Sequence, residues 1–377
     1  MNAGIDVYLD WNATSPPHPD VIEVMRRTAL EAWGNPSSVH ASGRRAAAIV
    51  EAARGTVARA LCVQGRDVAF TSGGTEANNL ALRAARGLVL SALEHPSITR
   101  VGEALARQGR PVEWVPVSSA GRIEPDAVRE ALDRLPRGSH VALMAVNHET
   151  GVIQPVSAVA EVVHAAGGLL HVDAVQALGK LGPNSWLGAD SLAVAAHKIR
   201  GPKGIGALGW STPEAAPSAV LLGGAQERGL RPGTVDPVAL AGFHTALERL
   251  SDRAICPQAL GVLRDRVERE LSAVAQINGE GAARVPHVTN LSFAGWKGDE
   301  LVAALDLAGV RVSSGSACSA GTSEPSKVIE AMLGRERARS AVRVSLGETT
   351  TAAEIDQALS AWRRVLAARA SIPSSVA

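Results

Sequence analysis

The stretch Asp67-Val68-Ala69-Phe70-Thr71-Ser72-Gly73-Gly74-Thr75-Glu76 decides the fold class of this chain. A short apolar run, predicted to be a strand, passes through a glycine pair directly into a predicted helix that opens with Thr75. The glycines let backbone N–H groups converge and a helix N-terminus carries partial positive charge, so this turn can hold an anion such as phosphate. The alternative is an ordinary tight turn in which Thr75 is the helix N-cap.

The alternation of strand and helix continues over most of the chain. Amphipathic stretches separate the apolar runs, as in the helix predicted around Val156, Val159 and Val163. The predicted strands are 67–71, 88–92, 112–117, 141–146, 169–172, 191–195 and 205–210. Apolar strands between helices indicate an α/β fold with a mostly parallel sheet that is covered on both faces. Ligands of such sheets bind at the carboxyl ends of the strands.

The pattern changes after about residue 255. Helical patterns become longer there, and the predicted strands are fewer, at 288–293, 310–313 and 342–346. We therefore predict a large α/β domain and a smaller α+β domain that also includes the N-terminal segment. The predicted boundaries are 15–255 for the large domain, and 1–14 with 256–377 for the small one.

The composition excludes several classes of protein. Among 377 residues, 38 are Lys or Arg and 37 are Asp or Glu, and this balance argues against direct nucleic-acid binding. No apolar run approaches the roughly 18 residues of a membrane span, and the N-terminus does not resemble a signal peptide. The three cysteines show no CxxC spacing, which favours a reducing, cytoplasmic compartment. No metal site is expected, because no cysteine has a second cysteine or a histidine at ligand spacing.

Two chemically important side chains follow predicted strands. Asp173 ends one strand, where an acid either caps the next helix or faces a ligand. Lys198 follows another in Ala196-His197-Lys198, although a lone lysine is usually a solvated charge. Together with the anion-binding turn they form the set that pyridoxal 5′-phosphate (PLP) requires. The lysine forms the Schiff base, the carboxylate keeps the pyridine nitrogen protonated and the turn holds the phosphate.

A cysteine lies in a loop of small residues, Val312-Ser313-Ser314-Gly315-Ser316-Ala317-Cys318-Ser319-Ala320-Gly321. We expect this loop, between a predicted strand and a helix begun by Glu324-Pro325, to be exposed. Cys318 is therefore a candidate nucleophile. Cys62 and Cys256 lie in helix-like apolar surroundings and are expected to be inert packing residues.

With these residues in place, the chain resembles the PLP-dependent cysteine desulfurases of the NifS/IscS type, within the class V aminotransferase family. The resemblance implies a PLP-dependent transferase of fold type I, with a mostly parallel seven-stranded sheet in its large domain. It covers nearly the whole chain in ordered blocks, which are 8–14, 35–40, 71–80, 94–96, 147–155, 171–180, 197–206, 223–234, 313–318 and 342–347.

The resemblance also implies roles for individual residues. Lys198 looks like the Schiff-base lysine, Asp173 like the partner of the pyridine nitrogen, and His95 like the histidine that stacks on the ring and helps to move protons. The remaining cofactor contacts that it implies are Gln176 to the ring hydroxyl, Gly74, Thr75 and His197 to the phosphate, and Thr234 to the phosphate of the other subunit of a homodimer.

The implied reaction converts L-cysteine to L-alanine. Arg343 is similar to the arginine that binds the substrate carboxylate, Asn12 and His148 line the substrate site, and Cys318 takes up the sulfur as a persulfide. Lys198 removes the α-proton, and His95 is the residue expected to activate the Cys318 thiol. A sulfur-acceptor protein, in iron–sulfur cluster or thio-cofactor biosynthesis, is the expected partner.

Two positions depart from the family pattern. His148 replaces an asparagine that helps to bind the substrate carboxylate, so we expect a changed pH response, with a limb near the histidine reference pKa of ~6.5. Ala195 replaces a hydroxyl residue that binds phosphate, so one hydrogen bond to the phosphate is expected to be missing.

Two other functions stay open at this stage. One is a selenocysteine lyase or another PLP-dependent β-lyase of the same fold, against which Cys318 argues, since those reactions need no thiol nucleophile. The other is a non-catalytic binding protein, against which the intact set of Lys198, Asp173, Gln176 and His95 argues.

Overall fold

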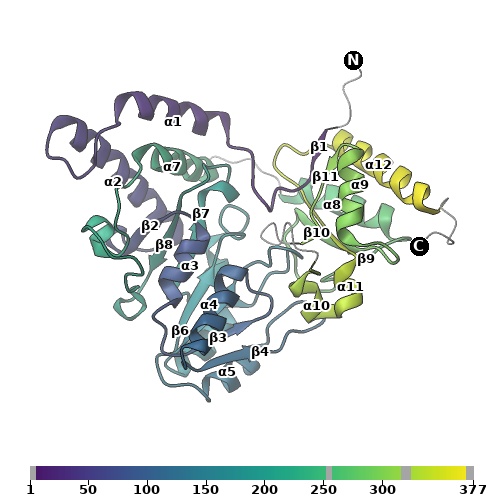
Figure 1. Ribbon diagram of the computed structural model, residues 1–377, viewed down its shortest axis with the longest axis horizontal. Coiled ribbons are helices and arrows are strands. Elements are labelled where there is room, and N and C mark those ends of the chain that lie inside the picture. The colour runs from purple at the N-terminus through teal and green to yellow at the C-terminus, as the bar shows by residue number, and fades with distance from the viewer. Residues whose placement is uncertain (1–5, 252–256, 316–323, 371–377) are drawn as a thin grey trace.

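The computed structural model describes residues 6–251, 257–315 and 324–370. A seven-stranded sheet forms the body of the molecule, and a second group of strands and helices lies beside it (Figure 1). The spatial order of the seven strands is β2 (Val68–Thr71), β8 (Gly206–Trp210), β7 (Ser191–Ala195), β6 (Leu169–Asp173), β5 (His140–Met144), β3 (Leu88–Ser91) and β4 (Val112–Val115).

The strand directions confirm the predicted, mostly parallel α/β sheet. The ladders that join β7, β6, β5, β3 and β4 are all parallel. Only β8 runs against its neighbours β7 and β2. The connecting helices are α3 (Gly74–Leu82), α4 (Pro96–Arg107), α5 (Pro125–Leu132) and α6 (Val156–Ala165). Predicted strand ends differ by one or two residues, since the strand expected at 112–117 already ends at Val115.

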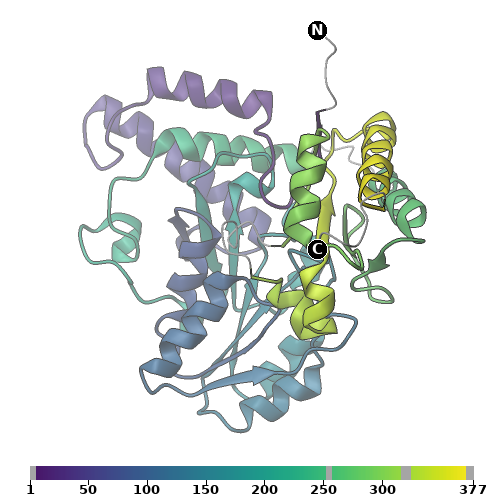
Figure 2. The same cartoon turned by 45° about the vertical axis from the view of Figure 1, so that its right-hand side comes forward.

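Both faces of the sheet are buried, as its apolar strands require. Alternate residues of one strand enter different cores: Val89 of β3 belongs to one apolar cluster, and Leu88 and Leu90 to another. The first cluster also includes residues of α2 (Ala41–Leu61) and α7 (Pro237–Ser251). Figures 1 and 2 show α1 (Pro19–Glu31) running beside these two helices on the same side of the molecule.

The smaller group of strands has its own apolar core, in which the Phe293 and Trp362 rings stack 6.2 Å apart. The N-terminal strand belongs to this group, because β1 (Val7–Tyr8) pairs with β11 (Val310–Arg311). The other elements are β9 (Gln276–Ile277), β10 (Val288–Ser292), β12 (Ala341–Ser345), α8 (Pro257–Leu271), α9 (Gly298–Leu307) and α12 (Ala352–Ala370). The short helices α10 (Lys327–Leu333) and α11 (Arg335–Arg339) lie beside them, but their buried apolar residues belong to the first cluster. The domain boundaries at 14/15 and 255/256 remain predictions.

A buried ion pair fixes the end of β2 from which the glycine turn departs. Both oxygens of Glu227 accept hydrogen bonds from Arg54, at 2.6 and 2.8 Å, and Glu227 also accepts from the Phe70 backbone N–H at 2.8 Å. The Arg54 guanidinium lies 4.7 Å from the centre of the Phe70 ring. Glu227 has a φ of 47°, a left-handed conformation that is costly for a residue other than glycine. These contacts offset that cost.

We expect Glu227→Gln to lower the free energy of unfolding by about 3 kcal/mol. Arg54 would lose its buried counter-charge and keep only the exposed carboxylate of Glu51, which lies 3.1 Å from its Nε. Denaturant unfolding followed by circular dichroism measures this loss. The control is Glu248→Gln, which breaks the exposed 2.6 Å pair with Arg59. Its expected cost is below about 1 kcal/mol. Equal losses in the two variants would contradict the structural role of the buried pair.

Candidate active site

A cavity of about 190 Å³ opens at the carboxyl ends of the parallel strands. Its position follows from the fold, because β5, β6 and β7 deliver the residues after their last positions to one edge of the sheet. It brings together residues that lie far apart in the sequence. The predicted site residues that line it are Asn12, Gly74, Thr75, His95, His148, Asp173, Gln176, His197, Lys198 and Arg343.

The glycine turn forms one wall of the cavity. Gly73 is the N-cap of α3, with a φ of 152°, and Thr75 is the second helical residue, so the alternative in which Thr75 caps the helix is wrong. A Cβ on Gly74 would lie 2.6 Å from Val175 Cγ2, and one on Gly206 would lie 2.7 Å from Gly73 Cα. Since only glycine allows this approach, the turn exposes backbone at the helix N-terminus, which is a geometry suited to an anion.

Asp173 occupies the end of β6 and both of its oxygens are engaged. Oδ1 accepts from the Val175 N–H at 3.0 Å, and Oδ2 accepts from Asn78 Nδ2 at 2.8 Å. Asn78 is fixed in turn by His171, whose Nε2 lies 2.9 Å from Asn78 Oδ1. Burial lowers the pKa of His171 to about 3, so this histidine is neutral at neutral pH. Asp173 therefore caps the following turn and lines the cavity as well.

Asn78 also connects Asp173 with His95. Its Nδ2 lies 2.8 Å from Ser97 Oγ, and Ser97 Oγ lies 2.8 Å from His95 Nδ1. The Ser97 backbone N–H donates to His95 Nδ1 at 3.1 Å, so this hydrogen bond assigns the proton of the neutral ring to Nε2. Burial is the main reason why the pKa of His95 is lowered. Sequence reasoning missed Asn78 and Ser97. Asn78 lies inside a helix, and Ser97 looks like an ordinary serine in the first turn of a helix.

The N-terminal segment lines the cavity next to Lys198. Lys198 Nζ donates to the carbonyl oxygens of Asn12 and Ala13, the latter at 2.9 Å. Gln176 Nε2 also donates to the Asn12 carbonyl, at 3.0 Å. His197 Nδ1 lies 3.1 Å from Thr14 Oγ1. The pKa of His197 falls to about 4, first through burial and then through nearby lysines, so its ring is neutral.

Arg343 also lines the cavity and is almost fully buried. Its Nη2 pairs with Asp10 at 2.6 Å, and Nη1 donates to the His148 carbonyl at 3.0 Å. The same carbonyl accepts from Asn12 Nδ2 at 3.2 Å. Arg343 Nε, Asn12 Oδ1 and His148 Nδ1 are buried, and none has a hydrogen-bond partner among the described residues. Buried polar atoms normally have partners, so this end of the cavity is suited to a polar ligand.

His148 is enclosed by the site. Its ring meets the His95 ring edge to face, with 5.6 Å between centres. Burial, His95, Arg343 and Lys198 all lower its pKa well below the ordinary histidine value. We therefore expect any limb of the pH profile that His148 causes to lie below the ~6.5 predicted from the sequence. Ala195, the other departure from the family pattern, ends β7 and lines the cavity without a hydroxyl group.

One predicted residue, Thr234, is exposed on a segment that does not line this cavity. Cys318 and Cys256 lie outside the described residues. Cys62 is exposed at the end of α2 with a φ of 58°, so its expected role as a buried packing residue is wrong. The helix predicted to start at Glu324-Pro325 begins instead at Lys327, capped by Ser326.

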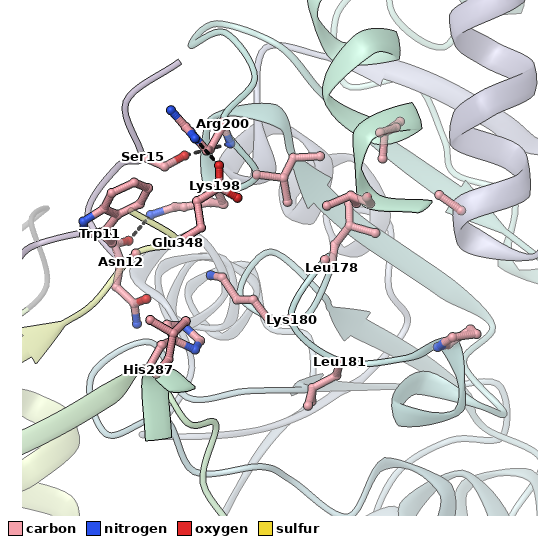
Figure 3. A pocket seen from close by; sticks show the side chains of 18 of the residues that line it. Trp11, Asn12, Ser15, Leu178, Lys180, Leu181, Lys198, Arg200, His287 and Glu348 are labelled. Atoms are coloured by element: carbon pink, nitrogen blue, oxygen red, sulfur yellow. Dashed lines mark hydrogen bonds and ion pairs between the residues drawn. The ribbon is translucent and has the colours of Figure 1, made fainter. Parts of the chain in front are cut away.

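A larger cavity of about 630 Å³ adjoins the first one, and Asn12 and Lys198 line both (Figure 3). Lys180, Arg200 and Glu348 stand around it, with Arg200 paired to Glu348. Asp173, His95 and the glycine turn line only the smaller cavity. The chemically distinctive groups therefore gather there, and we assign the smaller cavity as the candidate active site.

Because the pKa of His148 is lowered in the folded protein, we expect the folded state to become less stable as the pH falls. Below the unfolded-state pKa of ~6.5 the unfolded chain takes up a proton that the folded ring resists, so stability falls as the pH falls. We expect His148→Asn to lose less stability than the wild type between about pH 7 and pH 5. Unfolding midpoints measured across this range test the difference. Parallel curves for the two proteins would contradict the buried, neutral state of His148.

The chain is similar to known proteins over most of its length. The aminotransferase class-V family model matches residues 7–358. A cysteine desulfurase from Cereibacter sphaeroides is 40% identical over 370 residues, which are 94% of each chain.

Solved structures give the same result. A NifS-like protein from Rickettsia africae has a TM-score of 0.86 at 28% identity, over 96% of this chain and 99% of that one. SspA in complex with cysteine has a TM-score of 0.77 at 27% identity, over 92% of this chain and all of that one. The chain belongs to the class-V aminotransferase family.

Proposed function

We propose that this chain is a PLP-dependent cysteine desulfurase that converts L-cysteine to L-alanine and takes up the sulfur as a persulfide on Cys318. The observation that carries the proposal is the meeting of Lys198, Asp173, His95 and Arg343 in one cavity. The full-length similarity to a protein named cysteine desulfurase supports it.

The residues of the cavity fit PLP. The exposed backbone at Gly73 and Gly74, with Thr75 and His197, would hold the phosphate. Asp173 would pair with the pyridine nitrogen, and Gln176 with the ring hydroxyl. His95 would cover the ring, and Lys198 would bind the cofactor covalently. When bound, PLP supplies an electron sink for bond cleavage next to the substrate amino group. Ala195 supplies no hydroxyl, so one phosphate contact is absent.

The polar end of the cavity fits the carboxylate of L-cysteine. Arg343 is held by Asp10 and by the His148 carbonyl, and its Nε has no partner among the described residues. A guanidinium held in this way binds a carboxylate with defined geometry. Asn12 and His148 stand beside it and would complete the contacts. The solved structure of SspA in complex with cysteine concerns a protein of similar fold and supports the same substrate here.

The chain's own residues then carry the proton and sulfur transfers. Lys198 would take the α-proton of the substrate, because its Nζ reaches the edge of the cavity at Asn12 and Ala13. The Cys318 thiolate would attack the substrate sulfur, so that the carbon–sulfur bond breaks and a sulfur–sulfur bond forms. His95 Nε2 carries the proton of the neutral ring, so His95 would accept the Cys318 proton only after Nδ1 leaves Ser97.

A homodimer is part of the proposal. Large apolar side chains are exposed near the α1–α2 connection and on the segment before η5 (Gln226–Gly229), both on the side away from the small sheets (Figures 1 and 2). They include Leu30, Trp33, Val39, Val220, Leu221 and Leu222. Burying them against a second copy would remove this surface from water. Thr234 lies exposed just beyond η5 and would reach the phosphate bound to the other subunit.

The product defines the further partners. A persulfide is a sulfur donor, so a sulfur-acceptor protein is proposed, serving iron–sulfur cluster or thio-cofactor synthesis.

No helix within the described ranges has both the length and the apolar character of a membrane span. A cytoplasmic location is proposed from the thiol chemistry of Cys318, which needs a reducing compartment. Direct nucleic-acid binding is not part of the proposal.

The Lys198→Ala variant tests the covalent attachment of PLP. We expect the variant to bind the cofactor only through the phosphate and ring contacts, and to produce no measurable alanine from L-cysteine. Borohydride reduction followed by peptide mass analysis would label the peptide around residue 198 in the wild type only. Label on the same peptide of the variant would refute the assignment.

The Cys318→Ala variant separates a desulfurase from a β-lyase or a selenocysteine lyase. Adding L-cysteine should still change the absorbance of the bound cofactor, while alanine and persulfide formation fall to background because no thiol receives the sulfur. Cys62→Ala is the matched control and should retain near-normal rates. Near-normal alanine formation in Cys318→Ala would favour a lyase that needs no protein thiol.

A further inference from the structure

Arg200 lies two residues after Lys198 and has an unusual backbone conformation. Its φ is 66°, in the left-handed region that is costly for a residue other than glycine. Its N–H donates to Ser15 Oγ at 2.8 Å, and its carbonyl accepts from the His18 N–H at 3.0 Å. These two contacts hold the residues after Lys198 in a conformation that Arg200 would not adopt by itself.

The N-terminal segment formed by residues 11–18 connects this loop with the small group of strands. On the side of the loop, the N–H and the Oγ of Ser15 both donate to the His197 carbonyl, at 3.0 and 2.7 Å. On the other side, the N–H of Asn12 donates to Ser345 Oγ, at the end of β12, at 2.9 Å. The segment therefore joins the loop that follows β7 to the last strand of the chain.

The side chain of Arg200 makes the same connection directly. Its guanidinium pairs with the carboxylate of Glu348, just after β12, and the two side chains are only 12% and 16% exposed (Figure 3). Arg200 Nε also donates to the Pro16 carbonyl at 3.0 Å, and the guanidinium lies 5.8 Å from the centre of the Trp11 ring. Because salt screens a partly buried ion pair weakly, this contact resists relative movement of the loop and β12.

The connection sets a separation that the proposed reaction needs. Arg200 is two residues from Lys198, and Glu348 is five residues from Arg343. In the proposed reaction Arg343 holds the carboxylate of the substrate, while Lys198 removes the proton from the neighbouring carbon atom. The two side chains come from different groups of strands, so their separation depends on what joins those groups.

We propose that Arg200 is a positioning residue, which acts through Glu348 and the N-terminal segment to place Lys198 against a substrate held by Arg343. This inference rests on the proposed function, because it takes Lys198 as the base and Arg343 as the ligand of the carboxylate. Arg200 lines the larger cavity and not the smaller one, so in that scheme it touches neither the cofactor nor the substrate.

The test compares Arg200→Gln and Glu348→Gln with the wild type, all loaded with PLP. Exchange of the α-proton of L-alanine with deuterated solvent, followed by NMR, reports proton removal and needs no thiol. The exchange rate at saturation should fall between about ten- and a hundredfold, because a small misplacement of a reacting group costs that much. The half-saturating concentration of L-alanine should stay within about threefold, because Arg343 itself is unchanged.

Two further variants test whether the ion pair is the cause. The double variant Arg200→Gln with Glu348→Gln should be no slower than the slower single variant, because both changes break one contact. Arg200→Lys retains a positive charge opposite Glu348 and should exchange the α-proton faster than Arg200→Gln does. A double variant as slow as the product of two independent losses would contradict the action of Arg200 through Glu348.

A second measurement does not depend on the reaction. Hydrogen exchange of the backbone amides of residues 11–18, with and without added PLP, should become faster in Arg200→Gln and in Glu348→Gln. The matched control is Glu268→Gln, which breaks a 2.7 Å pair between Arg284 and α8, with exposures of 10% and 11%. Its amide exchange in this segment and its α-proton rate should match the wild type. A control slowed as strongly as Arg200→Gln would overturn the positioning role.

The outcomes separate the two proposals. Normal α-proton rates in Arg200→Gln and Glu348→Gln would refute the positioning role, and so would a loss that comes only from weaker binding of L-alanine. Wild-type protein that exchanges the α-proton of L-alanine but forms no alanine from L-cysteine would refute the desulfurase function and leave the role of Arg200. Wild-type protein that exchanges no α-proton would refute both, because Lys198 would then not act as the base.

Discussion

The parallel direction of the central strands is the constraint on which the rest of this structure depends. Parallel strands bring all their carboxyl ends to one edge, so the residues after β2, β5, β6 and β7 meet although they are far apart in sequence. The glycine turn, the His148 turn, Asp173 and Lys198 each occupy one of these ends. The ion pair between Arg54 and Glu227 holds β2 in register at the margin of this arrangement.

Burial sets the chemistry of the cavity. His95, His148, His171 and His197 all have lowered pKa values, with desolvation as the leading cause. They are therefore neutral hydrogen-bonding groups at neutral pH, and the positive charge of the site resides on Lys198 and Arg343. That distribution suits an anionic cofactor at one end and a carboxylate at the other. Lowering the pH, rather than raising it, should therefore destabilise the folded site, because protonation would charge these buried histidines.

The N-terminal segment and the small sheets complete the site from outside the large sheet. The Asn12 carbonyl accepts from both Lys198 and Gln176, and Arg343 of β12 is held by Asp10 and His148. The pair between Arg200 and Glu348 lies in the same junction. The cavity is thus assembled from both groups of strands, so a change in their relative position would alter the substrate end more than the Asp173 end.

The sequence by itself determined the α/β class, the glycine turn, and the places of Asp173 and Lys198, because strand periodicity and strand-to-helix turns are local properties. The ordered family blocks also pointed to His95, Gln176 and Arg343. Only the tertiary structure decided which buried polar groups support them. Asn78, Ser97 and Asp10 act through side-chain directions and long-range contacts, which no local pattern encodes. The exposure of Cys62 was likewise unpredictable, because the sequence does not show that Cys62 is itself the left-handed residue that ends α2.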